Sequence, residues 1–264
     1  MNVLTQIVEE TRTRVARRAT VVPLPELVRA GEQRLAGLDA IRDFRGALRA
    51  PGISVIAEHK RSSPSAGVIR AELELADVVS AYERAGAAAL SVLTEESRFG
   101  GTLADLATAR AASSLPILRK DFIVEEYQVH ETLAGGADAI LLIVAALDTG
   151  TLIRLHSLAT QLGLATLVEV HDAIELDAAH EIGAEIVGIN NRDLTTLEVD
   201  VERTYQLLPD VPHGAVVVAE SGFRRHAQLA QLAAAGVDAA LVGEALMRAP
   251  DIEAATRVLL GSQA

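Results

Sequence analysis

Four similar segments recur along the chain, and the clearest of them is Gly135-Gly-Ala-Asp-Ala-Ile-Leu141. The other three are Ala85-Gly-Ala-Ala-Ala-Leu-Ser91, Ile182-Gly-Ala-Glu-Ile-Val-Gly188 and Ala235-Gly-Val-Asp-Ala-Ala-Leu241. Their spacing is roughly 50 residues, about two βα units. In each copy a glycine can end a helix in the left-handed conformation, and the apolar residues after it can begin a buried strand. The repeat therefore predicts helices that lead into buried strands.

Short apolar runs between these copies raise the number of predicted strands to eight. Helical patterns, such as those at 73–84 and 224–234, alternate with the strands instead of clustering. This alternation favours an α/β fold with a single (β/α)8 TIM barrel. A doubly wound open sheet is the alternative, and the length of 264 residues also allows two smaller domains. The predicted strands lie at about 53–58, 88–94, 116–119, 138–143, 165–169, 186–190, 215–219 and 239–243.

We predict a helical extension over residues 1–50 that packs on a catalytic barrel domain over residues 51–264. An amphipathic helix is marked by Val3, Leu4, Ile7, Val8 and Val15, and Pro23 and Pro25 interrupt the chain before a second helical stretch. We do not interpret the amino terminus as a targeting peptide, because no apolar signal core follows it. The longest apolar run is too short to cross a membrane.

Charge and composition restrict the possible partners. The chain has 24 basic and 36 acidic residues and a formal net charge of -12, so we expect no nucleic-acid and no membrane partner. A small anionic substrate would need a locally positive pocket. The absence of cysteine excludes disulfides and thiolate chemistry, and it fits a reducing cytosol. We expect a cytoplasmic protein, and a monomer rather than an obligate oligomer.

Ionisable side chains stand at the ends of three predicted strands, where a barrel holds its chemistry. Lys120 directly follows the third strand and Glu169 ends the fifth. A lysine at a partly desolvated mouth can have a lowered pKa and act as a general acid, and an inward carboxyl is suited to acid or base work. Glu58 and Lys60 face one side of the first strand, and His59 faces the other. Structural ion pairs are an equally good explanation for Glu58 and Lys60.

Polar and small residues follow the last three strands. Asn190 and Arg192 could orient a carboxylate or hydroxyl, although turn chemistry explains the asparagine nearly as well. After the seventh and eighth strands, small residues expose backbone N–H groups where barrels often bind phosphate. These phosphate candidates are Ser221, Gly222, Gly243 and Glu244.

Other kinds of site have no supporting motif. The histidines are scattered and no pair has the spacing of a helical zinc motif, so we predict no metal site. There is no glycine-rich nucleotide loop and no nucleophile elbow.

Six sequence motifs occur in an order that is specific, although each alone is a weak signal. They are Ile56-Ala-Glu-His-Lys-Arg-Ser-Ser-Pro-Ser65, Ser91-Val-Leu-Thr94 with Phe99-Gly-Gly-Thr-Leu103, Leu118-Arg-Lys-Asp-Phe122, Val168-Glu-Val170, Ile189-Asn-Asn-Arg-Asp193 and Ala219-Glu-Ser-Gly222. Together they closely resemble the indole-3-glycerol phosphate synthase family. The resemblance runs from about residue 50 to the end, and the helical extension is also like that family.

The resemblance implies a reaction that needs neither a metal nor an organic cofactor. The family closes the indole ring of 1-(2-carboxyphenylamino)-1-deoxyribulose 5-phosphate in tryptophan biosynthesis, with loss of carbon dioxide and water. By this resemblance Lys120 protonates the ribulose carbonyl while the aromatic ring carbon attacks it. Glu169 is then the general base of the later dehydration. Glu58 and Asn190 assist the proton transfers and hold the hydroxyls.

The resemblance also implies the binding residues for this phosphorylated, anthranilate-derived substrate. Lys60 counters its anionic groups, Phe122 packs on its aromatic ring, and Arg192 orients carboxylates. Ser63 and Glu220 complete the predicted substrate-binding set. Ser221, Gly222, Gly243 and the backbone of Glu244 receive the phosphate.

Two residues depart from the family pattern. Ala66 stands where many relatives carry a lysine, and Glu244 stands where some carry a small hydroxyl residue. We expect the Glu244 carboxylate to point away from the phosphate, because like charges repel.

Two other functions fit the fold. A phosphoribosylanthranilate isomerase shares the architecture, but the missing cysteine argues against its usual acid–base pair. A catalytically silent barrel would have no need of Glu58, Lys60, Lys120, Glu169 and Asn190 together.

Overall fold

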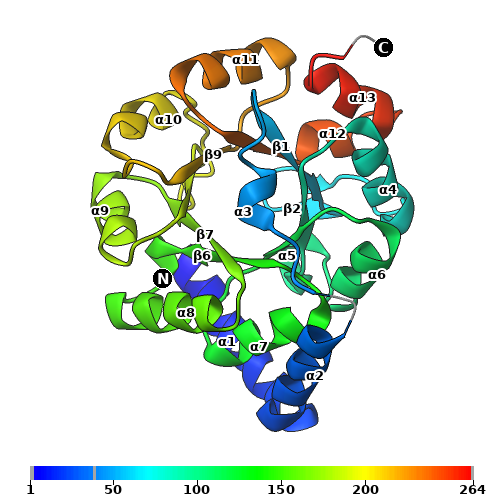
Figure 1. Cartoon of the computed structure of the whole chain (residues 1–264), viewed down its shortest axis with the longest axis vertical. Coiled ribbons are helices and arrows are strands. Elements are labelled where there is room, and N and C mark those ends of the chain that lie inside the picture. The colour runs from blue at the N-terminus through cyan, green and yellow to red at the C-terminus, as the bar shows by residue number, and fades with distance from the viewer. Residues whose placement is uncertain (1–2, 38–39, 263–264) are drawn as a thin grey trace.

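The computed structural model describes residues 3–37 and 40–262, which contain a closed barrel of parallel strands (Figure 1). The strands are β1 Ser54–His59, β4 Ala89–Leu93, β5 Ile117–Lys120, β6 Ala139–Ile143, β7 Ala165–Val170, β8 Ile186–Asn190, β9 Val216–Glu220 and β10 Ala239–Val242. They follow one another around the ring in chain order, and β10 pairs with β1 to close it. Closure confirms the predicted (β/α)8 barrel and rules out the open sheet.

The predicted strand ends agree with the structure to within one residue, but two of the differences matter. Lys120 was expected just after its strand, and it is instead the last residue of β5. Glu220 was also expected after a strand, and it is the last residue of β9. The reason is that the ladder continues through both residues: Lys120 pairs with Leu93, and Glu220 pairs with Asn190 and Leu241. The sheet therefore fixes the backbone position of each residue.

Helices surround the barrel and alternate with its strands (Figure 1). The helical patterns at 73–84 and 224–234 are confirmed as α4 Leu75–Ala85 and α11 His226–Ala235. The loop after β1 carries a small ribbon of β2 Ser62–Ser63 and β3 Gly67–Val68. The other helices after β1 are α5 Glu96–Phe99, α6 Ala104–Ala112, α7 Glu126–Gly135, α8 Thr149–Gln161, α9 Ala173–Glu181, α10 Glu202–Leu207, α12 Glu244–Met247 and α13 Ile252–Leu259, with 3-10 turns η1 Val144–Ala146 and η2 Leu208–Asp210.

The glycines of the four repeated segments have the predicted left-handed conformation. Gly86, Gly136 and Gly236 cap α4, α7 and α11 with φ values of 95°, 96° and 101°, and Gly183 follows α9 with φ 70°. A side chain with a Cβ atom is disfavoured at such angles, so glycine permits the turn from helix to strand.

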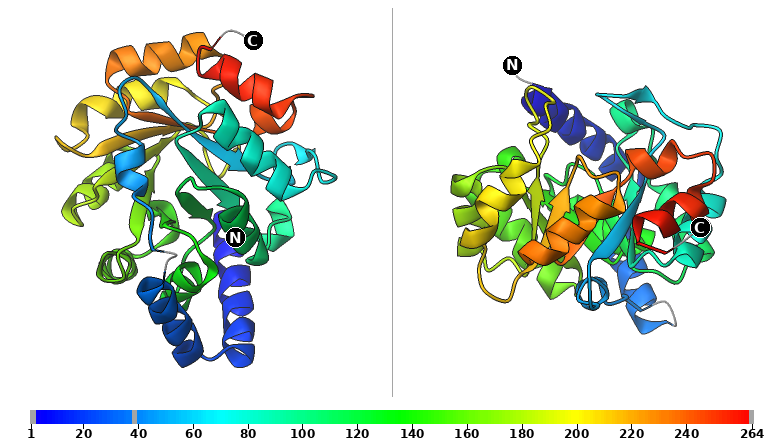
Figure 2. Two further views of the ribbon diagram at one scale, coloured as in Figure 1. Left: turned by 45° about the vertical axis from the view of Figure 1, so that its right-hand side comes forward. Right: turned by 90° about the horizontal axis from the view of Figure 1, so that it is seen from above.

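Three helices precede the barrel: α1 Val3–Val21, α2 Leu24–Ala36 and α3 Phe44–Ala47. Ile7, Val8 and Val15 are buried, which confirms the amphipathic helix. Arg18 on α1 pairs with Glu131 on α7 at 2.6 Å, and the turn between α1 and α2 projects past the ring of helices (Figure 2). The division of the chain into an extension and a barrel domain at residue 50 stays a prediction.

The core has two main layers. One fills the barrel interior with residues such as Ile56, Leu118 and Leu141, and α3 adds Phe44 to it. The other lies between the strands and the surrounding helices, and includes Val55 and Leu90. Across the described ranges 3–37 and 40–262, no helix combines the length and apolar character needed to cross a membrane.

His59 is buried on the face of β1 opposite Glu58, with 1% of its surface exposed. Neither ring nitrogen has a hydrogen-bond partner among the described residues. Burial, together with the nearby Arg61 guanidinium, lowers the pKa of His59 to about 4. An unpaired buried polar group costs about 1–3 kcal/mol, so His59 should destabilise the barrel.

We predict that His59→Val raises the free energy of unfolding by about 1 kcal/mol at neutral pH, because it removes the unpaired nitrogens at similar volume. The difference in the free energy of unfolding between the variant and wild type should increase at acidic pH. The unfolded imidazole binds a proton more readily than the folded one, so wild-type stability falls as the pH drops from about 6.5 toward about 4. Urea unfolding at several pH values measures the difference. The exposed His180→Val is the control, and equal pH slopes for His59→Val and wild type would contradict the prediction.

Candidate active site

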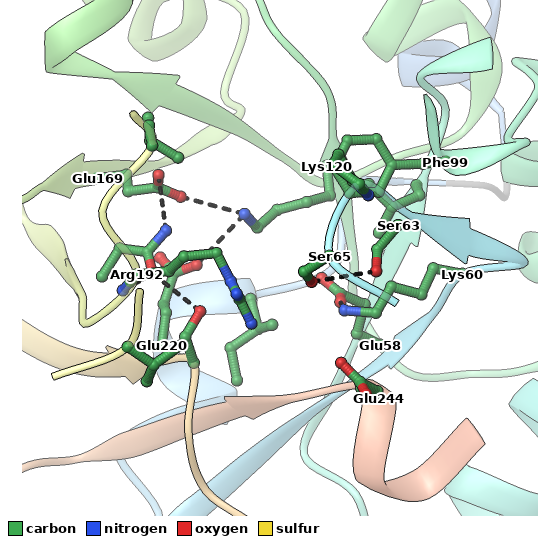
Figure 3. Close-up of a pocket in the computed structure, with 18 of the residues that line it drawn as sticks. Glu58, Lys60, Ser63, Ser65, Phe99, Lys120, Glu169, Arg192, Glu220 and Glu244 are labelled. Carbon is green, nitrogen blue, oxygen red and sulfur yellow. Dashed lines mark hydrogen bonds and ion pairs between the residues drawn. The ribbon is translucent and has the colours of Figure 1, made fainter. Parts of the chain in front are cut away.

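A cavity of about 420 Å³ opens at the carboxyl ends of the strands (Figure 3). Residues from the loops after β1, β4, β5, β8, β9 and β10 line it. The strands β6 and β7 themselves contribute Leu141, Ile143 and Glu169. All thirteen residues named as site candidates line this one cavity. They are Glu58, Lys60, Ser63, Lys120, Phe122, Glu169, Asn190, Arg192, Glu220, Ser221, Gly222, Gly243 and Glu244.

Lys120 occupies the centre of the charged part of the cavity. Its Nζ lies 3.1 Å from Glu169 Oε2 and 3.3 Å from Glu220 Oε2, and 14% of its side chain is exposed (Figure 3). Burial by itself lowers the pKa of Lys120, but the carboxylates of Glu169, Glu220 and Glu58 outweigh burial and raise the pKa above its ordinary value. The expectation of a lowered pKa is therefore wrong, because a single lysine faces several carboxylates.

Glu169 and Glu220 share Lys120, yet their ionisation differs. Burial opposes the charge on Glu169, but Lys120, His171 and the Asn190 amide lower its pKa below the ordinary value. Asn190 Nδ2 donates to Glu169 Oε1 at 3.0 Å. Burial raises the pKa of Glu220 to about 8, and the charge of Glu169 adds to this effect against the opposing pull of Lys120. Two carboxyls with separated pKa values can serve as base and acid in one site.

Glu58 and Lys60 form a second charged pair, on the same side of β1 as predicted. Lys60 Nζ donates to Glu58 Oε1 at 2.6 Å, and Ser91 Oγ donates to Glu58 Oε2 at 3.3 Å. Burial disfavours ionisation of Glu58, but Lys60 and Lys120 outweigh it and keep its pKa below the ordinary value. A Cβ atom on Gly243 would lie 2.5 Å from Glu58 Oε1, so glycine is required there for Glu58 to pack.

Asn190 is held in one orientation by its neighbours. Ser221 Oγ and the backbone N–H of Arg192 donate to Asn190 Oδ1 at 2.9 and 3.0 Å. The amide nitrogen is thereby directed at Glu169. The Arg192 side chain donates to the Leu197 carbonyl at 2.8 Å, which holds the loop after β8 against the cavity.

Small residues lie after β9 and β10, as predicted. Ser221 has φ 66° and Gly222 has φ 95°, and Gly243 precedes α12. Glu244 Oε1 accepts a hydrogen bond from Arg248 Nε at 3.0 Å. Arg248 is exposed, so a cation outside the cavity partly offsets the Glu244 charge.

The apolar part of the cavity includes residues that the sequence did not single out as site residues. Leu4 and Ile7 reach it from α1, Phe99 reaches it from the end of α5, and Leu197 reaches it from the loop after β8. Phe99 lay within a quoted motif, but nothing in the sequence connected α1 to the mouth of the barrel. Within the described ranges, Leu197 and Ser221 are the non-glycine residues with positive φ, and both line the cavity. Such strained residues cluster at functional sites.

Among the residues described, no three or more His, Asp or Glu side chains are grouped so that they could hold a metal ion. The side chains of the cavity instead form acid–base pairs. The fold and this site together define an acid–base enzyme built on a (β/α)8 barrel.

Comparison with known proteins identifies the family. The family model described as indole-3-glycerol phosphate synthase matches residues 4–259. An indole-3-glycerol phosphate synthase of Aromatoleum aromaticum is 48% identical over 98% of this chain and 99% of the relative. One of Parafrankia sp. is 49% identical over 95% of this chain and 92% of the relative. The chain belongs to the indole-3-glycerol phosphate synthase family, a family of carboxy-lyases in tryptophan biosynthesis.

Solved structures that resemble the chain share its fold at low identity. A 3-hexulose-6-phosphate synthase matches with a TM-score of 0.64 and 17% identity over 80% of this chain and 100% of that one. A mutant tryptophan synthase alpha-subunit from Pyrococcus furiosus matches with a TM-score of 0.62 and 16% identity over 79% of this chain and 98% of that one. These likenesses show the barrel alone.

We predict that Lys120 keeps its proton to above pH 10.5 in the free protein, because three carboxylates surround it. Lysine stands only at positions 60 and 120, so NMR of protein labelled with ¹³C-lysine yields two lysine side-chain signals to follow with pH. Lys60→Arg assigns them. In Glu169→Gln/Glu220→Gln, burial should dominate and the pKa should fall below that of wild type. A wild-type Lys120 that titrates below pH 10 would contradict the prediction.

Proposed function

We propose that the chain converts 1-(2-carboxyphenylamino)-1-deoxy-D-ribulose 5-phosphate to indole-3-glycerol phosphate by lysine and glutamate acid–base catalysis. The observation that carries this proposal is Lys120 Nζ within 3.3 Å of two carboxyls whose pKa values are shifted in opposite directions. Ring closure needs an acid at the carbonyl and, later, a base and an acid for dehydration. The cavity supplies one group for each step.

The first step is carbon–carbon bond formation. Lys120 is charged before substrate binds, so it can stabilise the developing alkoxide and donate a proton to the ribulose carbonyl oxygen. The aromatic ring carbon that carries the carboxylate attacks the carbonyl carbon. Carbon dioxide then leaves from that ring carbon, and its bonding electrons restore the aromatic ring.

The second step is dehydration. Glu169 is ionised and oriented by Asn190, so it can take the proton that is lost as the indole double bond forms. Glu220 has a pKa of about 8 and is therefore largely protonated at neutral pH. It can donate its proton to the departing hydroxyl. This role is more direct than the substrate binding that the sequence analysis predicts for Glu220.

The substrate has an aromatic end and a phosphate end, and the cavity has a region suited to each. Phe122 lines it beside apolar residues, where an aromatic ring can pack, and Lys60 can face the carboxylate. Arg192 and Ser63 line the same cavity and complete this end. The phosphate would lie between the loops after β9 and β10, on N–H groups of Ser221, Gly222, Gly243 and Glu244.

Direct assay tests the proposal. The protein is treated with chelator and incubated with the carboxyphenylamino ribulose phosphate, while indole absorbance and fluorescence are followed. We expect steady product formation without added metal or cofactor. Tight binding without turnover would favour a silent barrel. Neither binding nor turnover would overturn the proposed substrate.

We predict that Lys120→Ala lowers kcat by at least about 100-fold with a smaller change in KM, because the proton donor acts in the transition state. Glu169→Gln should lower kcat as well, because the base is lost. Arg17→Ala, an exposed change on α1, is the control and should leave both constants near wild type. Unchanged kcat in Lys120→Ala would remove Lys120 from the mechanism.

A further inference from the structure

Glu169 has one neighbour that the proposed mechanism does not use. His171 follows β7 two residues after Glu169, so both side chains point to the same side. Its Nε2 lies 3.5 Å from Glu169 Oε1, and its Nδ1 lies 3.0 Å from Glu175 Oε2. The Nε2 atom is buried and has no hydrogen-bond partner among the described residues. An unpaired ring nitrogen thus faces the proposed catalytic base.

These three side chains lead from the cavity toward the surface. The exposed fraction of the side chain is 1% for Glu169, 11% for His171 and 17% for Glu175. Glu169 lines the cavity, whereas His171 and Glu175 are not among its lining residues. A proton that moves through His171 therefore reaches Glu169 without crossing the space that the substrate occupies.

The proposed reaction needs such a supply. The substrate carboxylate leaves as neutral carbon dioxide, and the hydroxyl leaves as water, so each turnover takes up one proton from solvent. Lys120 and Glu220 give protons and Glu169 takes one. After product forms, this buried group of side chains is one proton short, and it cannot start again until that proton is replaced.

We infer that His171, held by Glu175, is a relay residue that returns this proton from solvent to the buried site through Glu169. The inference rests on the proposed function. Glu169 first gives the proton that it took during dehydration to Lys120 Nζ, 3.1 Å away, and Lys120 passes a proton on to Glu220 Oε2, 3.3 Å from Nζ. The Nε2–H bond of the imidazolium then breaks as an O–H bond forms on Glu169, and Glu169 passes this second proton to Lys120. A proton from solvent then restores the imidazolium. Glu175 keeps Nδ1–H in place and stabilises the imidazolium, and the backbone N–H of His171 also donates to Glu175 at 2.8 Å.

Charges around the ring suit this role. Burial disfavours the imidazolium, but the hydrogen bond to Glu175 and the charges of Glu169, Glu175 and Glu220 outweigh burial and raise the pKa of His171 above 6.5. These neighbours thus favour the protonated ring. The gap of 3.5 Å to Glu169 is long for a hydrogen bond, but catalytic contacts often shorten when substrate binds.

The test compares His171→Asn with wild type. Asparagine keeps a donor near Glu175 but cannot carry a proton. We expect kcat to fall on the order of 10-fold with KM nearly unchanged. In wild type, deprotonation of His171 should lower activity at alkaline pH, and this part of the pH profile should disappear in the variant. Added imidazole should restore turnover to His171→Ala in proportion to its concentration. The exposed His180→Asn on α9 is the control and should match wild type.

Glu175→Gln supplies a second arm that needs no turnover. NMR titration of the His171 ring should show a lower pKa in this variant than in wild type, since a charged partner is lost. Wild-type kcat and pH profile in His171→Asn would overturn the relay. The relay would also be overturned if imidazole did not rescue His171→Ala and the fall in activity at alkaline pH were unchanged in His171→Asn. Such a loss of activity would be a structural effect. Failure of wild type to turn over the substrate would instead overturn the proposed function.

Discussion

The site depends on one constraint: the charge of a largely buried lysine must be balanced by carboxyl groups, and those groups must come from other strands. Lys120 on β5 meets Glu169 on β7 and Glu220 on β9. An isolated buried charge is very costly, so the three groups hold one another in place. The closed barrel makes this possible, because it brings the ends of nonadjacent strands to a common centre.

The two kinds of basic residue have different places in this protein. Lysine occurs only at positions 60 and 120, and both line the cavity. Arg192 and Arg224 also line the cavity, but other arginines hold the scaffold. Arg119 is fully buried beside Asp121 and Glu131, and Arg61 makes two bonds to Asp105. The planar guanidinium suits fixed pairs with carboxylates, whereas an ammonium can change its proton and its partner more readily. The rarity of lysine is visible in the sequence alone, and it supports Lys60 and Lys120 as site residues.

The amino-terminal helix belongs to the site as well as to the scaffold. Arg14 on α1 pairs with Glu95 at 2.8 Å, and Glu95 in turn accepts bonds from backbone N–H groups at the start of α5. Glu95, Leu4 and Ile7 all line the cavity. The apolar stripe of α1 predicts that this helix packs against the rest of the protein. The spacing of its apolar residues does not indicate at which end of the barrel the helix lies.

By itself the sequence determined the barrel, its strand positions to within one residue, and a set of side chains that the structure gathers in one cavity. It could do so because strand ends, helix-ending glycines and short apolar runs are local patterns, and because six motifs resemble those of a known family. Only the tertiary structure decided the ionisation of these groups. The pKa of Lys120 is raised and not lowered, and that of Glu220 is raised to about 8, because of charges from distant strands. The physical reason is that electrostatic interactions depend on distances of a few ångströms between atoms far apart in the chain, which no local pattern specifies.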